Sequence, residues 1–329
     1  MKSKILTRLL LAGTVFILFS CKEYHITTKI NEDGSCERII IIKSDSQSGE
    51  DYDSMFPFDK SWKKTTSQNP DDSLKYVETY SKKFDSVEDL NRWLKKNSLL
   101  KTEASLEKKF RWFYTYYTYT ETYKKTNPFK QLPFEDYLSK EEIEKLYAGD
   151  INEDLSKKLD RYGAACMLNE LFDSLAVEMK NFSELNPELL KQNEEEISNV
   201  LSSGGDELQA FMEELESIYK TKTIWELKDE IVRIKTAIEN KAEALWKIQS
   251  SFSNDIIMPG LLLETNAKNI NGNKLTWKFE AVHFTYVDYK MTAQSRAAND
   301  WAMILTAVLV VLFIMAIIYA AFKRKKNVV

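Results

Sequence analysis

The amino-acid sequence predicts an α+β fold. An antiparallel β-sheet is built from the N- and C-terminal strands of an ectodomain, an α-helical subdomain is inserted in it, and one C-terminal transmembrane helix follows. Segments rich in Ile, Thr and aromatic residues, which favour strands, occur before residue 130 and again after residue 256. Residues 131–255 instead place apolar side chains at helical spacing. Residues 301–322 are apolar and contain no charged residue.

Residues 1–20 are predicted to be a lipoprotein signal peptide. A short basic start precedes an apolar run, Leu9–Phe19, that is too short to span a bilayer at roughly 20 residues per span. The run ends in Ser20 and Cys21, and a small residue directly before a cysteine resembles the bacterial lipobox. That resemblance implies cleavage before Cys21 and acylation of its thiol, by palmitate for example, so that membrane lipid holds the N-terminus. An uncleaved signal anchor with an incidental cysteine is the alternative.

Residues 21–130 are predicted to be the β-rich first part of the ectodomain. Two β-prone segments, Tyr24–Ile30 and Cys36–Lys43, flank an Asp-Gly turn and predict a hairpin. The polar residues 44–72 are predicted to be a long loop. The segment Ser86–Lys96 has a capping serine and apolar residues on one face, which predicts a helix.

The stretch Phe110–Tyr123 is the most β-prone part of the chain, with eight aromatic residues and four Thr. Alternation along one strand puts Trp112 and Tyr114 on one face, and Tyr117 and Tyr119 on the other. One face would then be core, and the other would be a groove that binds a lipid, glycan or peptide. Packing against the core and the helices explains the same pattern, so both alternatives stay open.

Residues 131–255 are predicted to be the helical insertion. It contains a capping box at Ser139–Glu142 and a long helix with an apolar seam from Ile224 to Phe252. The seam would pack on neighbouring helices, or pair with a partner chain. Residues 256–299 contain alternating strands and an Asn-Gly turn, and are predicted to complete one sheet. The two ends of that sheet would lie together near the membrane.

Residues 301–322 are predicted to be the transmembrane helix. At about 1.5 Å per residue such a segment covers a hydrocarbon core of about 30 Å. Four basic residues follow in the tail 323–329, which predicts a cytoplasmic C-terminus by the positive-inside rule. The ectodomain, 21–300, would then lie outside, in the periplasm of a cell whose cytoplasmic (inner) membrane holds this single-pass protein.

The charge distribution agrees with this topology. The chain has 46 basic and 50 acidic residues, and seven of the basic residues lie in 1–20 and 301–329. Residues 21–300 therefore carry 39 basic against 50 acidic residues, a net charge of −11. A nucleic-acid-binding protein would need an excess of basic residues in this region, so that class of protein is disfavoured.

Short motifs at the two ends of the ectodomain carry a family resemblance. They are Tyr24-His25, Asn31-Glu32-Asp33-Gly34-Ser35, Pro259-Gly260, Thr265-Asn266, Gly272-Asn273 and Thr276-Trp277. With the terminal helix they resemble the LppM-like family of bacterial membrane lipoproteins, which have a β-rich domain between a lipobox and a C-terminal span. The resemblance implies an envelope protein without established catalytic residues. The pair Lys22-Glu23 also resembles the export signal of Bacteroidetes surface lipoproteins, which implies a bacterium of that type, although the C-terminal helix argues against surface export.

Few residues point to catalytic or metal chemistry. The only histidines, His25 and His283, have no partners at metal-binding spacing, so we expect no metal site, cofactor or catalytic residue. Cys36 and Cys166 would form a disulfide in an oxidising envelope, or would be two buried thiols. We favour buried thiols, because Cys166 lies on an apolar helix face.

The sequence therefore predicts a non-enzymatic, membrane-anchored envelope lipoprotein that presents an acidic ectodomain to a protein partner. The alternative is a ligand-binding module that uses the aromatic stretch 110–123. A hydrolase with two dispersed carboxylates is a third hypothesis, which no motif supports.

Overall fold

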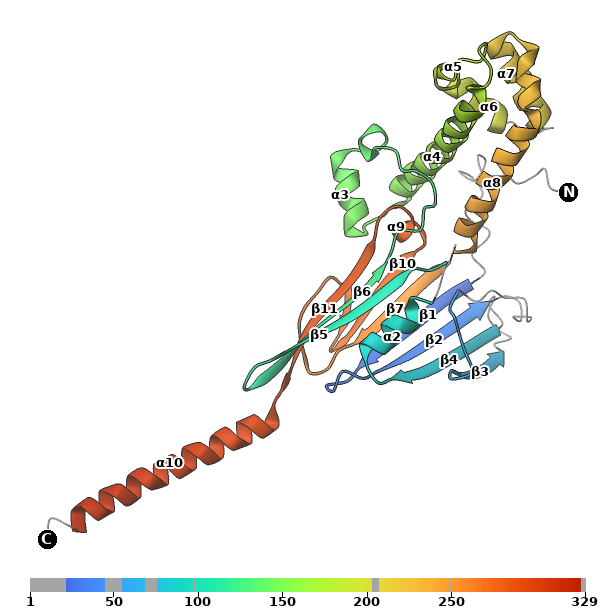
Figure 1. The fold of residues 1–329 in the computed structure, drawn as a ribbon. Coiled ribbons are helices and arrows are strands. Elements are labelled where there is room, and N and C mark those ends of the chain that lie inside the picture. Colours follow the sequence, from blue (N-terminus) through green and yellow to red (C-terminus); the bar gives the residue numbers. More distant parts are fainter. Residues whose placement is uncertain are drawn as a thin grey trace.

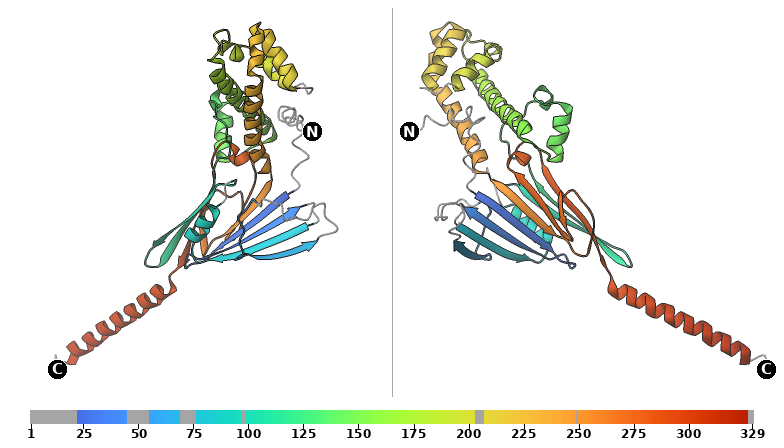
Figure 2. Two further views of the ribbon diagram at one scale, coloured as in Figure 1. Left: turned by 45° about the vertical axis from the view of Figure 1, so that its right-hand side comes forward. Right: turned by 180° about the vertical axis from the view of Figure 1, so that it is seen from behind.

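A computed structural model of the chain shows a β-sandwich, a helical arm at one end of it, and a long C-terminal helix at the other (Figure 1). The two further views show the same arrangement, with the arm and the C-terminal helix on opposite sides of the sandwich (Figure 2). The structure describes residues 22–44, 55–68, 76–96, 99–202, 207–248 and 250–326.

Two sheets make up the sandwich, and each combines strands from both ends of the ectodomain. The larger sheet has the order β3-β4-β2-β1-β7-β10-β9, and the smaller has the order β5-β6-β11-β8. The strands are β1 Lys22–Ile30, β2 Cys36–Ser44, β3 Lys63–Gln68, β4 Tyr76–Phe84, β5 Thr102–Phe110, β6 Tyr114–Tyr123, β7 Ser251–Ile257, β8 Leu261–Thr265, β9 Asn269–Asn271, β10 Lys274–Glu280 and β11 Tyr289–Ala298. The predicted α+β class is confirmed, but two sheets stand where one was predicted.

Strands β1 and β7 pair in parallel, whereas the other strand pairs run antiparallel. The parallel register runs from Glu23 opposite Ser251 to Lys29 opposite Ile257. Parallel neighbours need a long connection between them, and the helical arm is part of the chain that supplies it here.

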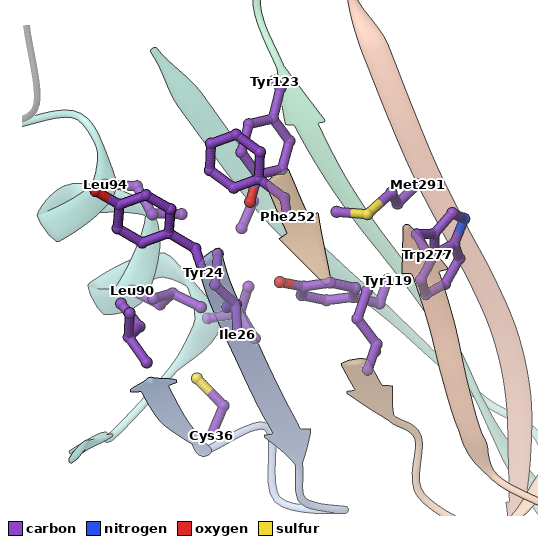
Figure 3. Packing of buried hydrophobic residues seen from close by; sticks show 14 of the residues in the cluster. Tyr24, Ile26, Cys36, Leu90, Leu94, Tyr119, Tyr123, Phe252, Trp277 and Met291 are labelled. Atoms are coloured by element: carbon purple, nitrogen blue, oxygen red, sulfur yellow. The ribbon is translucent and has the colours of Figure 1, made fainter. Parts of the chain in front are cut away.

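Alternating inward side chains from both sheets form one core (Figure 3). On β1 the side chains of Tyr24, Ile26 and Ile30 are buried, as the period of two in a strand requires. Figure 3 shows Tyr119 and Tyr123 of β6 in the same core, with helix α2 (Val87–Leu94) beside Tyr24. The core therefore holds the two sheets together.

The helical arm has a separate core of its own. Its helices are α3 Lys140–Ala148, α4 Glu153–Met179, α5 Glu188–Gln192, α6 Glu194–Ser202, α7 Glu207–Tyr219 and α8 Lys228–Lys247, with short 3-10 helices at Phe134–Asp136 and Lys222–Leu227. Helix α9 (Val282–Thr285) lies where the arm meets the sandwich, and α10 (Asp300–Lys326) is the C-terminal helix.

The predicted apolar seam from Ile224 to Phe252 is wrong at its C-terminal end. Helix α8 ends at Lys247, and Phe252 lies in β7 with its ring stacked on Phe279 at 5.3 Å. The alternation of Phe252, Asn254 and Ile256 is that of a strand, and pairing with β1 and β10 outweighs the helical spacing. Strand β7 therefore begins inside the predicted insertion 131–255.

The two ends of the sandwich differ in what they carry. We call the end with the β5–β6 turn (Arg111–Phe113) and the start of α10 the tip end, and the opposite end, where β1 and β7 begin, the arm end. The turn after β1 lies at the tip end, because Lys108 Nζ donates to the Asp33 carbonyl at 2.8 Å. Strand β11 also ends there, with Ala298 opposite Tyr114.

Strand β1 therefore begins far from α10. Its eight residue steps from Lys22 to Ile30 span about 26 Å at about 3.3 Å per residue. The expectation that the two ends of the sheet lie together is wrong, because β1 runs towards the tip end rather than away from it. The residue before Lys22 is Cys21, which lies outside the described residues.

Candidate functional site

The aromatic stretch forms a hairpin end and one strand rather than one continuous strand. Strand β5 ends at Phe110, and β6 begins at Tyr114. The Arg111 N–H donates to the Tyr114 carbonyl at 2.8 Å and closes the turn between them. The predicted strand over 110–123 is therefore wrong for Arg111–Phe113, because β5, which was not predicted, folds back onto β6.

Two of the four predicted binding side chains lie in the core. Tyr117 and Tyr119 are 3% and 0% exposed. The Tyr117 hydroxyl donates to the Glu32 carbonyl at 2.9 Å, which ties β6 to the β1–β2 turn. The Tyr119 hydroxyl donates to Glu121 Oε2 at 2.7 Å, deep between the sheets.

The other two side chains lie outside the core. Tyr114 is half-buried, with the guanidinium of Arg296 at 4.5 Å from the centroid of its ring. Trp112 lies in the turn and is 45% exposed. The structure therefore does not gather Trp112, Tyr114, Tyr117 and Tyr119 on one surface.

The turn instead joins the first residues of α10. The rings of Phe110 and Trp301 are stacked at 6.3 Å, and those of Trp112 and Trp301 meet edge-on at 5.7 Å. Trp112 Nε1 also donates to Thr306 Oγ1 at 2.8 Å. This contact between residues 194 positions apart was not predicted from the sequence.

Asn299 fixes the connection between β11 and α10. Its backbone N–H donates to the Phe113 carbonyl at 2.9 Å, and its side-chain amide donates to the Arg111 carbonyl at 2.6 Å. Its side-chain oxygen accepts a hydrogen bond from Thr115 Oγ1 at 2.9 Å. Because every hydrogen-bonding group of the side chain is used, the helix leaves the sandwich in a defined direction.

Helix α10 is the one helix among the described residues that is long and apolar enough to cross a membrane, over Asp300–Ala320. Large apolar side chains are exposed all round it from Ile304 to Tyr319. A helix that is apolar on every side and covered by no other element is typical of a membrane span.

A groove of about 580 Å³ lies at the tip end between the β1–β2 turn and the start of α10. Its walls include Asp33, Lys108, Phe110, Tyr117 and Trp301. The ammonium of Lys108 lies 5.7 Å from the centroid of the Tyr117 ring. Cationic, acidic and aromatic groups thus meet beside the turn.

An ion pair lies fully buried between the sheets. Arg38 of β2 and Glu121 of β6 are both 0% exposed and share two hydrogen bonds of 2.9 Å. Arg38 also donates to Thr28 Oγ1 at 3.0 Å, and Asn254 Nδ2 donates to Glu121 Oε1 at 3.2 Å. The pair joins the two sheets, and its burial excludes contact with a ligand.

The partners of Glu121 keep it ionised. Burial would raise the pKa of this carboxyl, but the charge of Arg38 and the hydrogen bonds from Arg38, Tyr119 and Asn254 outweigh it. The pKa of Glu121 therefore lies below its ordinary value. Arg38 and Glu121 were not singled out in the sequence, although strand alternation puts Arg38 on the same face as Cys36 and Ile40.

The two cysteines in the described residues are free and buried. Cys36 belongs to the sandwich core and Cys166 to the arm core, so the structure does not pair them. A disulfide requires Cα atoms within about 7 Å, which two separate cores do not provide. Burial raises the pKa of the Cys36 thiol to about 12, which makes it unreactive at neutral pH.

No group of three His, Cys, Asp or Glu side chains suited to a metal ion occurs in the part of the chain that the structure describes. His283 Nδ1 accepts a hydrogen bond from the Glu280 N–H at 3.2 Å, and burial lowers the pKa of its imidazole. His25 lies 3.5 Å from a carboxylate oxygen of Glu23 on the same strand. The two histidines therefore lie on different elements, β1 and α9.

No protein-family model and no curated protein matches the sequence. The folded domain of the LppM protein of Mycobacterium tuberculosis, determined by NMR, is similar with a TM-score of 0.31 and 9% identity, over 85% of this chain and 92% of that domain. A likeness of this size carries no argument, so the LppM-like resemblance, the lipobox and the Bacteroidetes-type origin stay predictions from the sequence.

Proposed function

We propose that this protein is a non-enzymatic envelope protein that α10 anchors in the cytoplasmic membrane, with the acidic ectodomain outside and the C-terminus in the cytoplasm. The observation that carries the proposal is α10 itself, an apolar helix exposed on all sides and followed by four basic residues. Basic residues directly after a span favour the cytoplasmic side. No nucleic acid is proposed as a partner.

The far end of the arm is the surface that we propose for a protein partner. Figure 1 shows α5, α6 and α7 at the end of the arm that is most distant from α10. Residues 184–219, which include these helices, contain ten acidic residues and one basic residue. A partner with a basic surface would complement this charge and would associate faster at low ionic strength.

Acylation of Cys21 is a second proposal, and it rests on the sequence alone. Because Lys22 begins β1 at the arm end, a lipid on Cys21 would attach at the opposite end of the sandwich from α10. A molecule held by both anchors in one leaflet would therefore lie along the bilayer. Incorporation of a palmitate analogue into the wild type and its loss in Cys21→Ser would support the acyl anchor, whereas labelling that survives in Cys21→Ser would contradict it.

Protease access tests the proposed topology. In cells with a permeabilised outer membrane, an added protease should cleave the ectodomain and leave a protected fragment that contains α10 and the tail. Full protection of the ectodomain until the inner membrane is broken would overturn the proposed orientation.

A photo-crosslinker at Glu213 of α7 should capture the partner, and one at Lys64 of β3, on the sandwich, should not.

The ligand-binding alternative is favoured by one observation, the groove beside the turn. Of the four predicted side chains, Tyr117 lines the groove and Trp112 lies in the adjacent turn. Tyr119 is fully buried and is therefore excluded from direct ligand contact. A lipid is the ligand class that suits a groove beside the start of a membrane helix.

A further inference from the structure

We propose that the tip end of the sandwich is a docking surface for the phospholipid of the same bilayer that α10 crosses. The β5–β6 turn lies at the boundary between headgroups and acyl chains, with Phe110, Trp112 and Phe113 in contact with lipid. This inference rests on the proposed membrane anchoring by α10.

The exposed apolar side chains of the sandwich gather at this end. Among its described residues six large ones are exposed, and they are Phe110, Trp112, Phe113, Leu261, Leu263 and Ile270. Strand pairing puts Leu261 opposite Arg296, two residues before β11 ends, and Ile270 opposite Leu275, next to the β9–β10 turn. Grouped apolar side chains on a surface mark a contact with a partner or a membrane.

Contact with α10 identifies the partner as lipid. Trp301 is the second residue of α10, and its ring touches both Phe110 and Trp112. The turn therefore lies at the level where α10 enters the bilayer, and this level is where tryptophan and tyrosine are enriched in membrane proteins.

The charges around the turn suit a headgroup layer. Lys109 and Arg111 are exposed on either side of Phe110. Long basic side chains next to inserted aromatic rings reach lipid phosphates while their stems stay on apolar surface. Acidic groups lie nearby in Asp33 and Asp300, so the surface does not require an anionic lipid.

Asn299 joins the β5–β6 turn to the start of α10. Contact of this turn with lipid would therefore orient the whole ectodomain. The hydrogen bonds of Asn299 to Arg111, Phe113 and Thr115 hold the turn against the start of α10. A sandwich whose tip end touches the bilayer stands on the membrane, with the helical arm directed away from it. Anchoring by α10 together with an acyl chain on Cys21 in the same leaflet is the competing arrangement, because β1 spans about 26 Å and the sandwich would then lie along the bilayer.

Depth-dependent quenching of a fluorophore in the full chain tests this proposal. A polarity-sensitive label is placed at Phe113→Cys, in a Cys21→Ser background, in vesicles of phosphatidylethanolamine and phosphatidylglycerol. The buried Cys36 and Cys166 should not react with the label. Lipids that carry a quencher just below the headgroup should reduce emission several-fold for this label.

Three control positions separate the outcomes. A label at Tyr147→Cys, an exposed residue of the arm, should not be quenched, whereas Leu312→Cys in α10 should be quenched by a deep quencher. Quenching at Leu312 without quenching at Phe113 would overturn the docking proposal and leave the anchor intact. Absence of quenching at Leu312 would overturn the anchor itself. Arg111→Cys, also in the turn, repeats the test if Phe113→Cys fails to fold, and it should behave as Phe113→Cys.

Discussion

The tip end and the arm end of the same sandwich have opposite surfaces. At the tip end six large apolar side chains are exposed, and the chain continues into an apolar helix. At the arm end the strands begin or end at residues such as Lys22, Ser44, Ser251 and Glu280, and the chain continues into an acidic helical arm. One core fills the sandwich between these ends, so the two ends differ in the side chains on their surfaces and not in their fold.

The two ends of a small sandwich can therefore present different surfaces while they share one core. Alternation along each strand points its apolar residues into the core. The turns and the strand ends therefore form the surfaces that contact other molecules. At the tip end Phe110, Trp112 and Phe113 have no place in the core because they lie at or beyond the last paired residues.

Charged residues introduced into α10 should abolish its insertion into the membrane. In a Cys21→Ser background, Val310→Arg combined with Leu312→Arg places two cations near the centre of the span, at a cost of about 2.5–3.5 kcal/mol each on the insertion scale. We expect most of the protein to leave the membrane fraction on alkaline extraction. Val232→Arg, an exposed apolar position of the arm, should stay in that fraction as the wild type does. Retention of the double variant would contradict the proposed anchor.

Removal of Glu121 should loosen the link between the two sheets. Glu121→Ala leaves Arg38 buried without its partner, and we expect the free energy of unfolding to fall by about 3–5 kcal/mol in urea titrations. Glu103→Ala, which loses only exposed ion pairs with Lys95 and Lys124, should lose less than about 1 kcal/mol. Equal losses in the two variants would show that the buried pair has no special role. The double variant Arg38→Met/Glu121→Leu should recover most of the loss.

The same carboxyl should make the sandwich sensitive to acid. The pKa of Glu121 is lowered in the folded protein, so its contribution to stability is present above the ordinary pKa of a glutamate and is lost as the pH falls through the lowered value. The free energy of unfolding should therefore decrease below about pH 4. Thermal midpoints across pH 3 to 7 measure this decrease, and the decrease should be smaller in Glu121→Gln, which does not titrate. Parallel curves for the two proteins would contradict the assignment to Glu121.

A change at the start of α3 should affect the arm and leave the tip end unchanged. Ser139 accepts from the Glu142 N–H at 3.3 Å, and Glu142 Oε2 accepts from the Ser139 N–H at 2.9 Å. Loss of this capping box in Ser139→Ala should reduce stability by about 1 kcal/mol. Hydrogen exchange should then be faster in α3 than in the wild type but unchanged in β5 and β6. Faster exchange at the β5–β6 turn would show that the two ends are coupled.

Local pattern was sufficient to predict part of this fold. The β1–β2 hairpin, helix α2 and the capping box of α3 lie where composition and spacing predict them, because each depends on residues close together in the chain. Strands β3 and β5 were missed. The residues KKTTSQ of β3 are polar and exposed throughout, and in TEASLEKKF of β5 the inward positions are Thr102, Ala104 and Leu106, which is a weak apolar alternation. Both strands lie at sheet edges, where charged residues discourage unwanted pairing.

The candidate site could not be predicted for a different reason. Its contacts join Trp112 to Thr306 and Asp33 to Lys108. The spacing of apolar residues along the sequence does not predict contacts between residues so far apart. The direction of β1, which puts Lys22 at the opposite end of the sandwich from α10, also depends on its pairing with β7 more than 220 residues later. Arg38 and Glu121 were accessible to sequence reasoning, since a charge at an inward strand position signals a buried partner.

The orientation of the sandwich on the membrane decides whether the tip end docks on lipid. In vesicles, energy transfer to an acceptor at the bilayer surface is measured from a donor at Glu32→Cys, in the turn at the tip end, and from one at Lys101→Cys, at the arm end. Both positions are exposed, and β1 spans about 26 Å between the two ends. We predict efficient transfer from Glu32→Cys and several-fold weaker transfer from Lys101→Cys. Equal transfer from both positions would mean that the ectodomain lies along the bilayer, and it would contradict docking through the tip end.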